Sequence, residues 1–168
     1  ASALVNKGDI EQGTRHYYIA LEHQPAYAEA HIKLGDLFLN LGEREKAINH
    51  YMAALQIDPN WMEAYNNLGI ALMQEGNIEA AIRQFQKALQ LKPDFEMAEN
   101  NLKRAVAIQK GIEAEIVRLQ TLLKENPGNV EMHFQLGNLY YRKGDQRQAM
   151  EQYKRALQLN PKFLPALN

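Results

Sequence analysis

Apolar residues recur along the chain at the three- and four-residue spacing of amphipathic helices. In the stretch 28–41 they stand at Ala30, Leu34, Leu37, Phe38 and Leu41, and this run stops at Gly42. A second run of the same kind, over residues 44–57, ends shortly before Pro59. Helices usually close before a proline, because its ring disfavours helical geometry in the preceding residue. The pattern therefore predicts two antiparallel helices of about 13 residues each, joined by a tight turn.

The same unit repeats every 34 residues through the chain. Five prolines stand at this interval, at Pro25, Pro59, Pro93, Pro127 and Pro161. The turn between the helices carries a glycine at Gly42, Gly76 and Gly144, where a left-handed conformation is required that only glycine adopts cheaply. Small residues recur in a fixed register and face bulky leucines and aromatic residues. The small set includes Gly35, Gly69, Gly137, Ala47, Ala81 and Ala149, and the bulky set includes Leu34, Leu68, Leu136, Tyr51, Phe85 and Tyr153. Such alternation lets neighbouring helices approach closely, so each unit is expected to gain stability from its neighbours.

This pattern resembles the tetratricopeptide repeat family. The resemblance is carried by Leu34-Gly35, Phe38, Ala47, Tyr51, Ala54 and Pro59, and by the residues 34 and 102 positions later. It implies an all-α fold, a right-handed α-solenoid of antiparallel helix hairpins whose first helices line a concave groove. It divides one array into a truncated repeat (1–27), full repeats (28–61, 62–95, 96–129 and 130–163) and the start of a further helix (164–168). Both ends look cut, so we expect an excerpt of a longer protein.

The unit 96–129 keeps the period but loses the signature. Lys103 replaces the mid-helix glycine, Lys110 replaces the turn glycine, and Gly111 lies one place late. Two interpretations remain open. The unit is either a degenerate hairpin that packs more openly, or residues 96–125 straighten into one helix, which would permit two chains to exchange halves. Of these we expect the hairpin.

Composition narrows the class of partner. The chain is 46% hydrophobic and 23% charged, as in soluble globular proteins. Nineteen basic residues against twenty acidic ones give a net charge of −1, so no overall field would attract nucleic acid or an anionic membrane. No apolar run approaches the roughly 20 residues of a membrane span. We therefore expect a protein or peptide ligand, no nucleic acid, and no membrane insertion by this segment.

Candidate chemistry is weak. The absence of cysteine excludes disulfides and thiolate metal sites, and the five histidines lack the spacing of a metal-binding helix motif. The glycines end or pack helices instead of forming a phosphate-binding loop. No nucleophile with a histidine-containing triad can be assembled. The sequence therefore predicts no enzyme active site, no cofactor and no metal in this segment.

The first helices of the repeats carry a candidate binding surface. Asn67, Asn101 and Gln135 are 34 residues apart, so stacking would form a ladder of amides that can donate to and accept from the backbone of an extended peptide. Similar asparagine ladders bind peptide backbone in other members of the family. Neighbouring apolar groups could receive ligand side chains, and the arginines could pair with acidic ones. The candidate peptide-binding groove comprises Asn66, Asn67, Ile70, Met73, Asn100, Asn101, Arg104, Ile108, Phe134, Gln135, Asn138, Tyr141 and Arg142.

Some family members grip the C-terminus of a chaperone with a clamp of lysines, asparagines and an arginine. Here only its central asparagine is matched, by Asn67 or Asn101, while positions that should be basic hold Ile32 and Met97. Capture of such a tail is disfavoured. The leading hypothesis is a non-enzymatic protein–protein interaction module or scaffold that binds a peptide in its concave groove. The alternatives are a substrate-recruiting region of a larger enzyme, such as a glycosyltransferase, or a scaffold that self-associates through uncapped ends or an opened fourth repeat.

Overall fold

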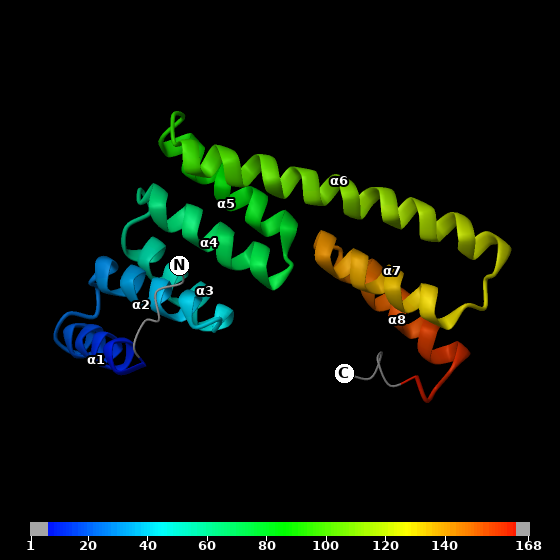
Figure 1. Ribbon diagram of the computed structural model, residues 1–168, viewed down its shortest axis with the longest axis horizontal. Helices are drawn as coiled ribbons and strands as arrows, with labels where there is room; N and C mark the ends of the chain where they lie inside the picture. Colours follow the sequence, from blue (N-terminus) through cyan, green and yellow to red (C-terminus); the bar gives the residue numbers. More distant parts are fainter. Residues whose placement is uncertain (1–6, 164–168) are drawn as a thin grey trace.

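The computed structural model describes residues 7–163, which form eight α-helices and no strand (Figure 1). In chain order they are α1 (Lys7–His23), α2 (Ala28–Asn40), α3 (Arg44–Ile57), α4 (Met62–Glu75), α5 (Ile78–Leu91), α6 (Glu96–Glu125), α7 (Val130–Lys143) and α8 (Gln146–Leu159). The predicted all-α fold of stacked helical hairpins is confirmed. The expected start of a further helix at 164–168, and the first six residues of the truncated repeat, lie outside the described residues.

The pairs α2–α3, α4–α5 and α7–α8 are the expected helical hairpins. Each turns through a glycine in the left-handed region, and φ is +94° at Gly76 and +90° at Gly144. Asn77 and Asp145 then cap the following helices, since their side-chain oxygens accept backbone N–H groups three residues on. The turn glycines therefore act as the sequence predicts.

Close packing within each hairpin depends on the mid-helix glycine. A Cβ atom added to Gly69 would lie 2.5 Å from the ring of Phe85, and one added to Gly137 would lie 2.5 Å from the ring of Tyr153. Phe85 is fully buried as a result. An ordinary side chain in place of these glycines would force the two helices apart.

The hairpin expected at 96–129 is wrong, because α6 is a single helix of 30 residues, about 45 Å long. Lys103 stands where the three hairpins have the glycine that accepts the facing ring. Lys110 stands at the turn position, and no non-glycine residue between 7 and 163 has a positive φ. Gly111 does not have a positive φ either. Both local requirements for the reversal are missing, so the helix continues.

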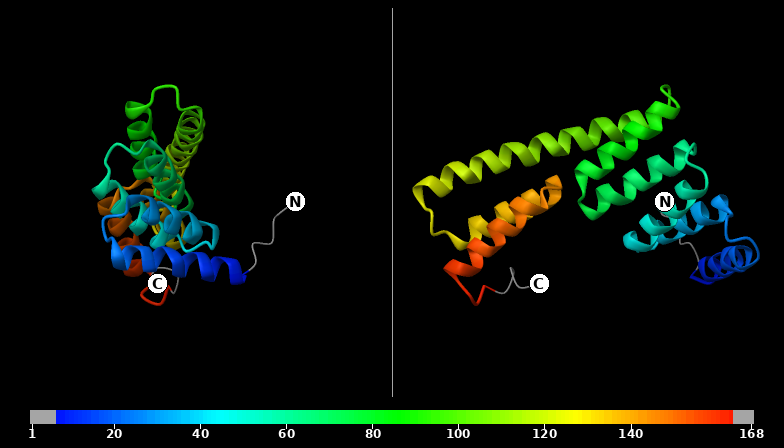
Figure 2. Two further views of the ribbon diagram at one scale, coloured as in Figure 1. Left: turned by 90° about the vertical axis from the view of Figure 1, so that its left-hand side faces the viewer. Right: turned by 180° about the vertical axis from the view of Figure 1, so that it is seen from behind.

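The straight α6 changes where the last hairpin lies. The stack α1–α5 sits against the N-terminal part of α6, and α7–α8 sits along its C-terminal part (Figures 1 and 2). The amide of Gln120 donates to the hydroxyl of Tyr140 at 2.8 Å, and Lys143 pairs with Glu113 at 3.5 Å. These contacts show that α7 runs antiparallel to the second half of α6.

Three clusters of buried side chains hold the array together. The first joins α2, α3 and α4 through residues such as Leu34, Tyr51 and Leu68. The second joins α5, α6 and α7 through Phe85, Ile116 and Leu136, and a smaller one lies between α5 and the start of α6. Among the described helices, none is both long and apolar enough to cross a membrane.

Candidate functional site

A groove of about 470 Å³ lies between α4 and the beginning of α6. It is lined by Glu63, Asn66, Asn67, Ile70, Phe95, Met97, Asn100 and Asn101. The α4 residues stand three and four positions apart and so occupy one face of that helix, and those of α6 do the same. Five residues of the predicted groove are thus brought together at one place.

The asparagines of the groove belong to a hydrogen-bonded chain that begins on α2. The carboxylate of Asp36 accepts from the amide of Asn67 at 3.0 Å. Asn67 accepts from Asn66 at 3.2 Å, and Asn66 accepts from Asn101 at 2.9 Å. Asn66 is only 3% exposed, so its amide requires these partners. The chain therefore links α2, α4 and α6 across the floor of the groove.

Tyr51, on α3, adds a further donor to the Asp36 end of this hydrogen-bonded chain. Its side chain is fully buried, and its hydroxyl donates to the same oxygen of Asp36 at 2.7 Å. Burial, together with the hydrogen bond to Asp36, raises the pKa of Tyr51. The hydroxyl consequently stays protonated and remains a donor to the carboxylate.

The remaining α4 and α6 candidates divide between groove, core and surface. Ile70 lines the groove and also packs against the second core cluster. Met73 and Ile108 pack against that cluster and do not line the groove. Arg104 is exposed one turn beyond Asn100 on α6. Ile70 is therefore the aliphatic candidate that faces both the core and the groove.

The candidates on α7 lie elsewhere. Phe134 packs against the rings of Tyr153 and Phe163, and Asn138 accepts from the hydroxyl of Tyr153 at 2.7 Å. Tyr141 is 53% exposed, and Arg142 is exposed beside it. These side chains lie on the last hairpin, outside the groove between α4 and α6, and Arg142 approaches Gly76 at the end of α4.

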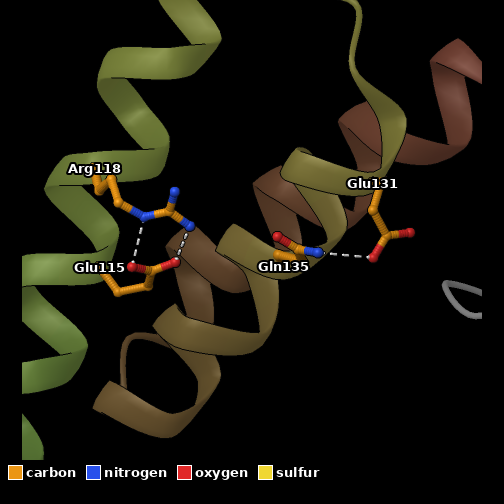
Figure 3. A network of polar contacts seen from close by, with 4 residues as sticks. All are labelled: Glu115, Arg118, Glu131 and Gln135. Atoms are coloured by element: carbon orange, nitrogen blue, oxygen red, sulfur yellow. Dashed lines mark hydrogen bonds and ion pairs between the residues drawn. The ribbon is translucent and has the colours of Figure 1, made fainter.

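Gln135 does not join the amide chain. Its amide donates to Glu131 on the same helix at 3.0 Å, while on α6 Arg118 pairs with Glu115 (Figure 3). Asn101 and Glu113 are about 18 Å apart along α6. Glu113 pairs with Lys143 of α7, and Gln135 lies about 12 Å from Lys143 along α7, in the direction away from Asn101. The straight α6 thus separates Gln135 from the two asparagines with which it shares the 34-residue register.

Sequence reasoning left Asp36, Glu63, Phe95 and Met97 out of the candidate set. A signal for Asp36 exists in the repeats themselves. Where the facing aromatic residue is a tyrosine, at positions 51 and 153, the residue 15 positions earlier is Asp36 or Asn138; where it is Phe85, that residue is Ile70. A buried hydroxyl needs an acceptor, so this pairing could have identified Asp36.

Two histidines form a second polar pair, outside the groove. The Nδ1 atoms of His31 and His50 are 3.0 Å apart, and the ring of Phe38 stacks on His50. The last hairpin has His133 and Gln152 in the same places, 2.8 Å apart. No cluster of three or more potential metal ligands of the histidine, cysteine or carboxylate type occurs within residues 7–163. The pair joins α2 to α3.

Comparison with known proteins agrees with this architecture. Family models described as TPR repeat and tetratricopeptide repeat match residues 35–76, and residues 63–95 and 130–163, which together exceed half of the chain. No curated protein matches the chain at a significant level.

Several solved structures share the fold. MamA is 26% identical, with 93% of this chain and 91% of that chain covered and a TM-score of 0.59. YrrB, described as a TPR protein with an unusual peptide-binding site, is 19% identical, with 95% and 82% covered and a TM-score of 0.57. The second TPR domain of human RPAP3, solved with the HSP70 peptide SGPTIEEVD, is 21% identical, with 59% and 82% covered and a TM-score of 0.56.

Proposed function

The chain belongs to the tetratricopeptide repeat family, and from this premise we propose that it is a non-enzymatic interaction module that binds a peptide in the groove between α4 and α6. Structural neighbours that bind peptides support a role in protein interaction. Peptide binding in this groove is a more specific proposal than a general role in protein interaction. It holds whether the array acts alone or recruits substrates for a larger enzyme.

The observation that carries this proposal is the composition of the groove. Its volume of about 470 Å³ falls within the range of ligand sites, roughly 300–1,000 Å³. Asn100 and Asn101 offer amides at its edge, and Ile70, Phe95 and Met97 offer apolar surface beside them. Recognition of an extended peptide needs both: polar groups for its backbone and apolar surface for its side chains.

The test must block the groove without breaking the internal hydrogen bonds. Alanine at Asn67 or Asn101 would also disrupt the chain to Asp36, so Asn100, which is exposed and lines the groove, is the better position. Random short peptides are selected on the wild-type protein and measured by fluorescence polarisation. We expect Asn100→Trp to weaken the selected peptides at least about tenfold, because the ring would occupy their site.

Val117→Trp is the matched control. Val117 is 61% exposed on the same helix, about 26 Å from Asn100. The Val117→Trp substitution introduces the same ring without changing the net charge, and it should leave the affinity for the selected peptides unchanged. Equal affinities for Asn100→Trp and wild type would remove the groove as the binding site.

Self-association through the opened repeat is a second candidate, and the continuous α6 is the observation that favours it. A straight helix between α1–α5 and α7–α8 would allow two chains to exchange their last hairpins. Light scattering over a concentration series tests this. A monomer at every concentration excludes stable exchange.

A further inference from the structure

We propose that this groove selects peptides that carry a lysine or arginine beside an apolar side chain, because its amide chain is anchored on Asp36 and presents acceptors to the ligand. The inference rests on the proposed function and adds the chemistry of the ligand. It departs from the sequence expectation that basic residues would receive acidic side chains.

Asp36 sets the direction of the whole chain. A carboxylate only accepts hydrogen bonds, so both Tyr51 and Asn67 must donate to it. The nitrogen of Asn67 is thereby directed at Asp36, and its oxygen is left to face Asn66. Asn66 must donate in turn and turns its own oxygen towards Asn101. One charge on α2 thus orients three amides on α4 and α6.

The chain ends in an acceptor. Asn101 donates inwards to Asn66, so its carbonyl oxygen is the terminal group of the series. Hydrogen bonds linked in this way polarise one another, and the polarisation here increases the negative charge on that oxygen. A ligand that donates is favoured there, and a cationic donor makes the stronger hydrogen bond.

The charge of the groove lining is also negative, like that on the oxygen of Asn101. Among the described residues that form the groove, Glu63 alone is charged. Lys33 on α2 and Arg104 on α6 are exposed cations, and neither lines the groove. Lys103 is paired with Glu99. Ile70, Phe95 and Met97 provide the apolar surface for the side chain next to the ligand's cation.

The last hairpin shows that the fold does not require a carboxylate at this position. Asn138 occupies the equivalent place and accepts the hydroxyl of Tyr153 at 2.7 Å, the distance found between Tyr51 and Asp36. A neutral amide therefore also accepts the hydrogen bond of the tyrosine at this position. What Asp36 adds is charge, and in α2–α4 that charge meets the amides of the groove.

The experiment uses Asp36→Asn, which keeps an acceptor for Tyr51 as Asn138 does for Tyr153. Random short peptides are selected on the wild-type protein, and a selected lysine- or arginine-containing peptide is resynthesised with glutamine in place of the cation. We expect wild type to prefer the cationic peptide about tenfold and Asp36→Asn to lose most of that preference. Asn138→Asp, which adds a carboxylate to the hairpin without the amide chain, should leave both affinities unchanged.

Two outcomes overturn the inference in different ways. If the selected peptides are blocked by Asn100→Trp but lack basic residues, or if Asp36→Asn weakens both peptides equally, the selection for cations is wrong and the groove remains a peptide site. If Asn100→Trp leaves binding intact, the proposed function itself is wrong and the inference falls with it.

Discussion

Single residues in this chain show how a repeat adjusts its interior polarity. Tyr51 and Tyr153 each bury a hydroxyl that meets an acceptor 15 residues earlier, and Phe85 has no hydroxyl and faces Ile70 in that register. An unpaired buried hydroxyl would cost about 1–3 kcal/mol, so tyrosine and acceptor must change together. The pair on α2–α3 differs from that on α7–α8 by the charge of Asp36 and by the deeper burial of Tyr51.

The His31–His50 pair makes the stability of the first hairpin depend on pH. Burial, and the neighbouring His31, lower the pKa of His50 below 6.5, so the folded state favours the neutral ring. The unfolded chain then binds more protons, and stability rises with pH. The contribution is complete above pH 6.5 and is lost as the pH falls from there through the lowered pKa.

His50→Gln tests this dependence, because Gln152 already partners His133 in the last hairpin. We expect the melting temperature of the wild type to fall more steeply below pH 6.5 than that of His50→Gln. Calorimetry at several pH values measures the difference, with His23→Gln on the exposed face of α1 as the control. Parallel curves for wild type and His50→Gln would contradict the assignment.

At the scale of elements, α6 follows from two missing glycines. Each hairpin needs one glycine where the helices touch and one where the chain reverses, and α6 has Lys103 and Lys110 there. The apolar residues of its second half, such as Ile116 and Leu119, share a buried cluster with α7 and the first half of α5 instead of folding back on the first half of α6. With both glycines missing the helix does not reverse, and its second half packs against these partners instead.

Restoring the glycines should close this repeat. Lys103→Gly with Lys110→Gly permits the close approach and the turn, and it removes helical propensity worth about 1 kcal/mol at each position. The chain has no cysteine, so cysteines at Glu96 and Lys124 give unique label sites. Their separation, about 42 Å in the open helix, should fall towards the 8–10 Å between packed helices.

Pulsed electron–electron double resonance detects the long distance of the open helix, and closure is seen as the loss of that distance. Gly111→Ala is the control, since an added Cβ meets nothing within 4 Å and should leave the long distance intact. If the distance is unchanged in the double variant, the missing glycines are not what keeps α6 straight. The cause would then lie in Glu115 and Leu122, which replace small residues of the second helix.

At the scale of the molecule, the buried side chains form two main packing regions that meet at the α4–α5 hairpin. One cluster joins α2, α3 and α4, and another joins α5, α6 and α7. Repeat arrays gain stability mainly from adjacent contacts, so damage should remain local. The straight α6 ends the candidate groove at Asn101 and carries the α7 candidates away from it.

Leu136→Ala tests the division. Leu136 is 2% exposed in the second cluster, and its truncation should cost about 2–5 kcal/mol. Hydrogen exchange should then accelerate in α7, α8 and the second half of α6, with α2 and α3 little affected. Leu34→Ala in the first cluster should show the opposite distribution. Acceleration of all helices alike would mean that the array unfolds as one unit.

The amino-acid sequence by itself determined the repeat period, the hairpin turns at Gly42, Gly76 and Gly144, and the all-α fold, because each depends on the identity of a residue at a fixed offset. It also identified the asparagines of α4 and α6. The tertiary structure decided that α6 stays straight, that Gln135 is carried away from Asn101, and that Asp36 directs the amides of the groove. These outcomes depend on contacts between helices distant in the chain: a helix folds back only where the packing gained outweighs the helical turn lost, and an amide takes its direction from the partner it meets.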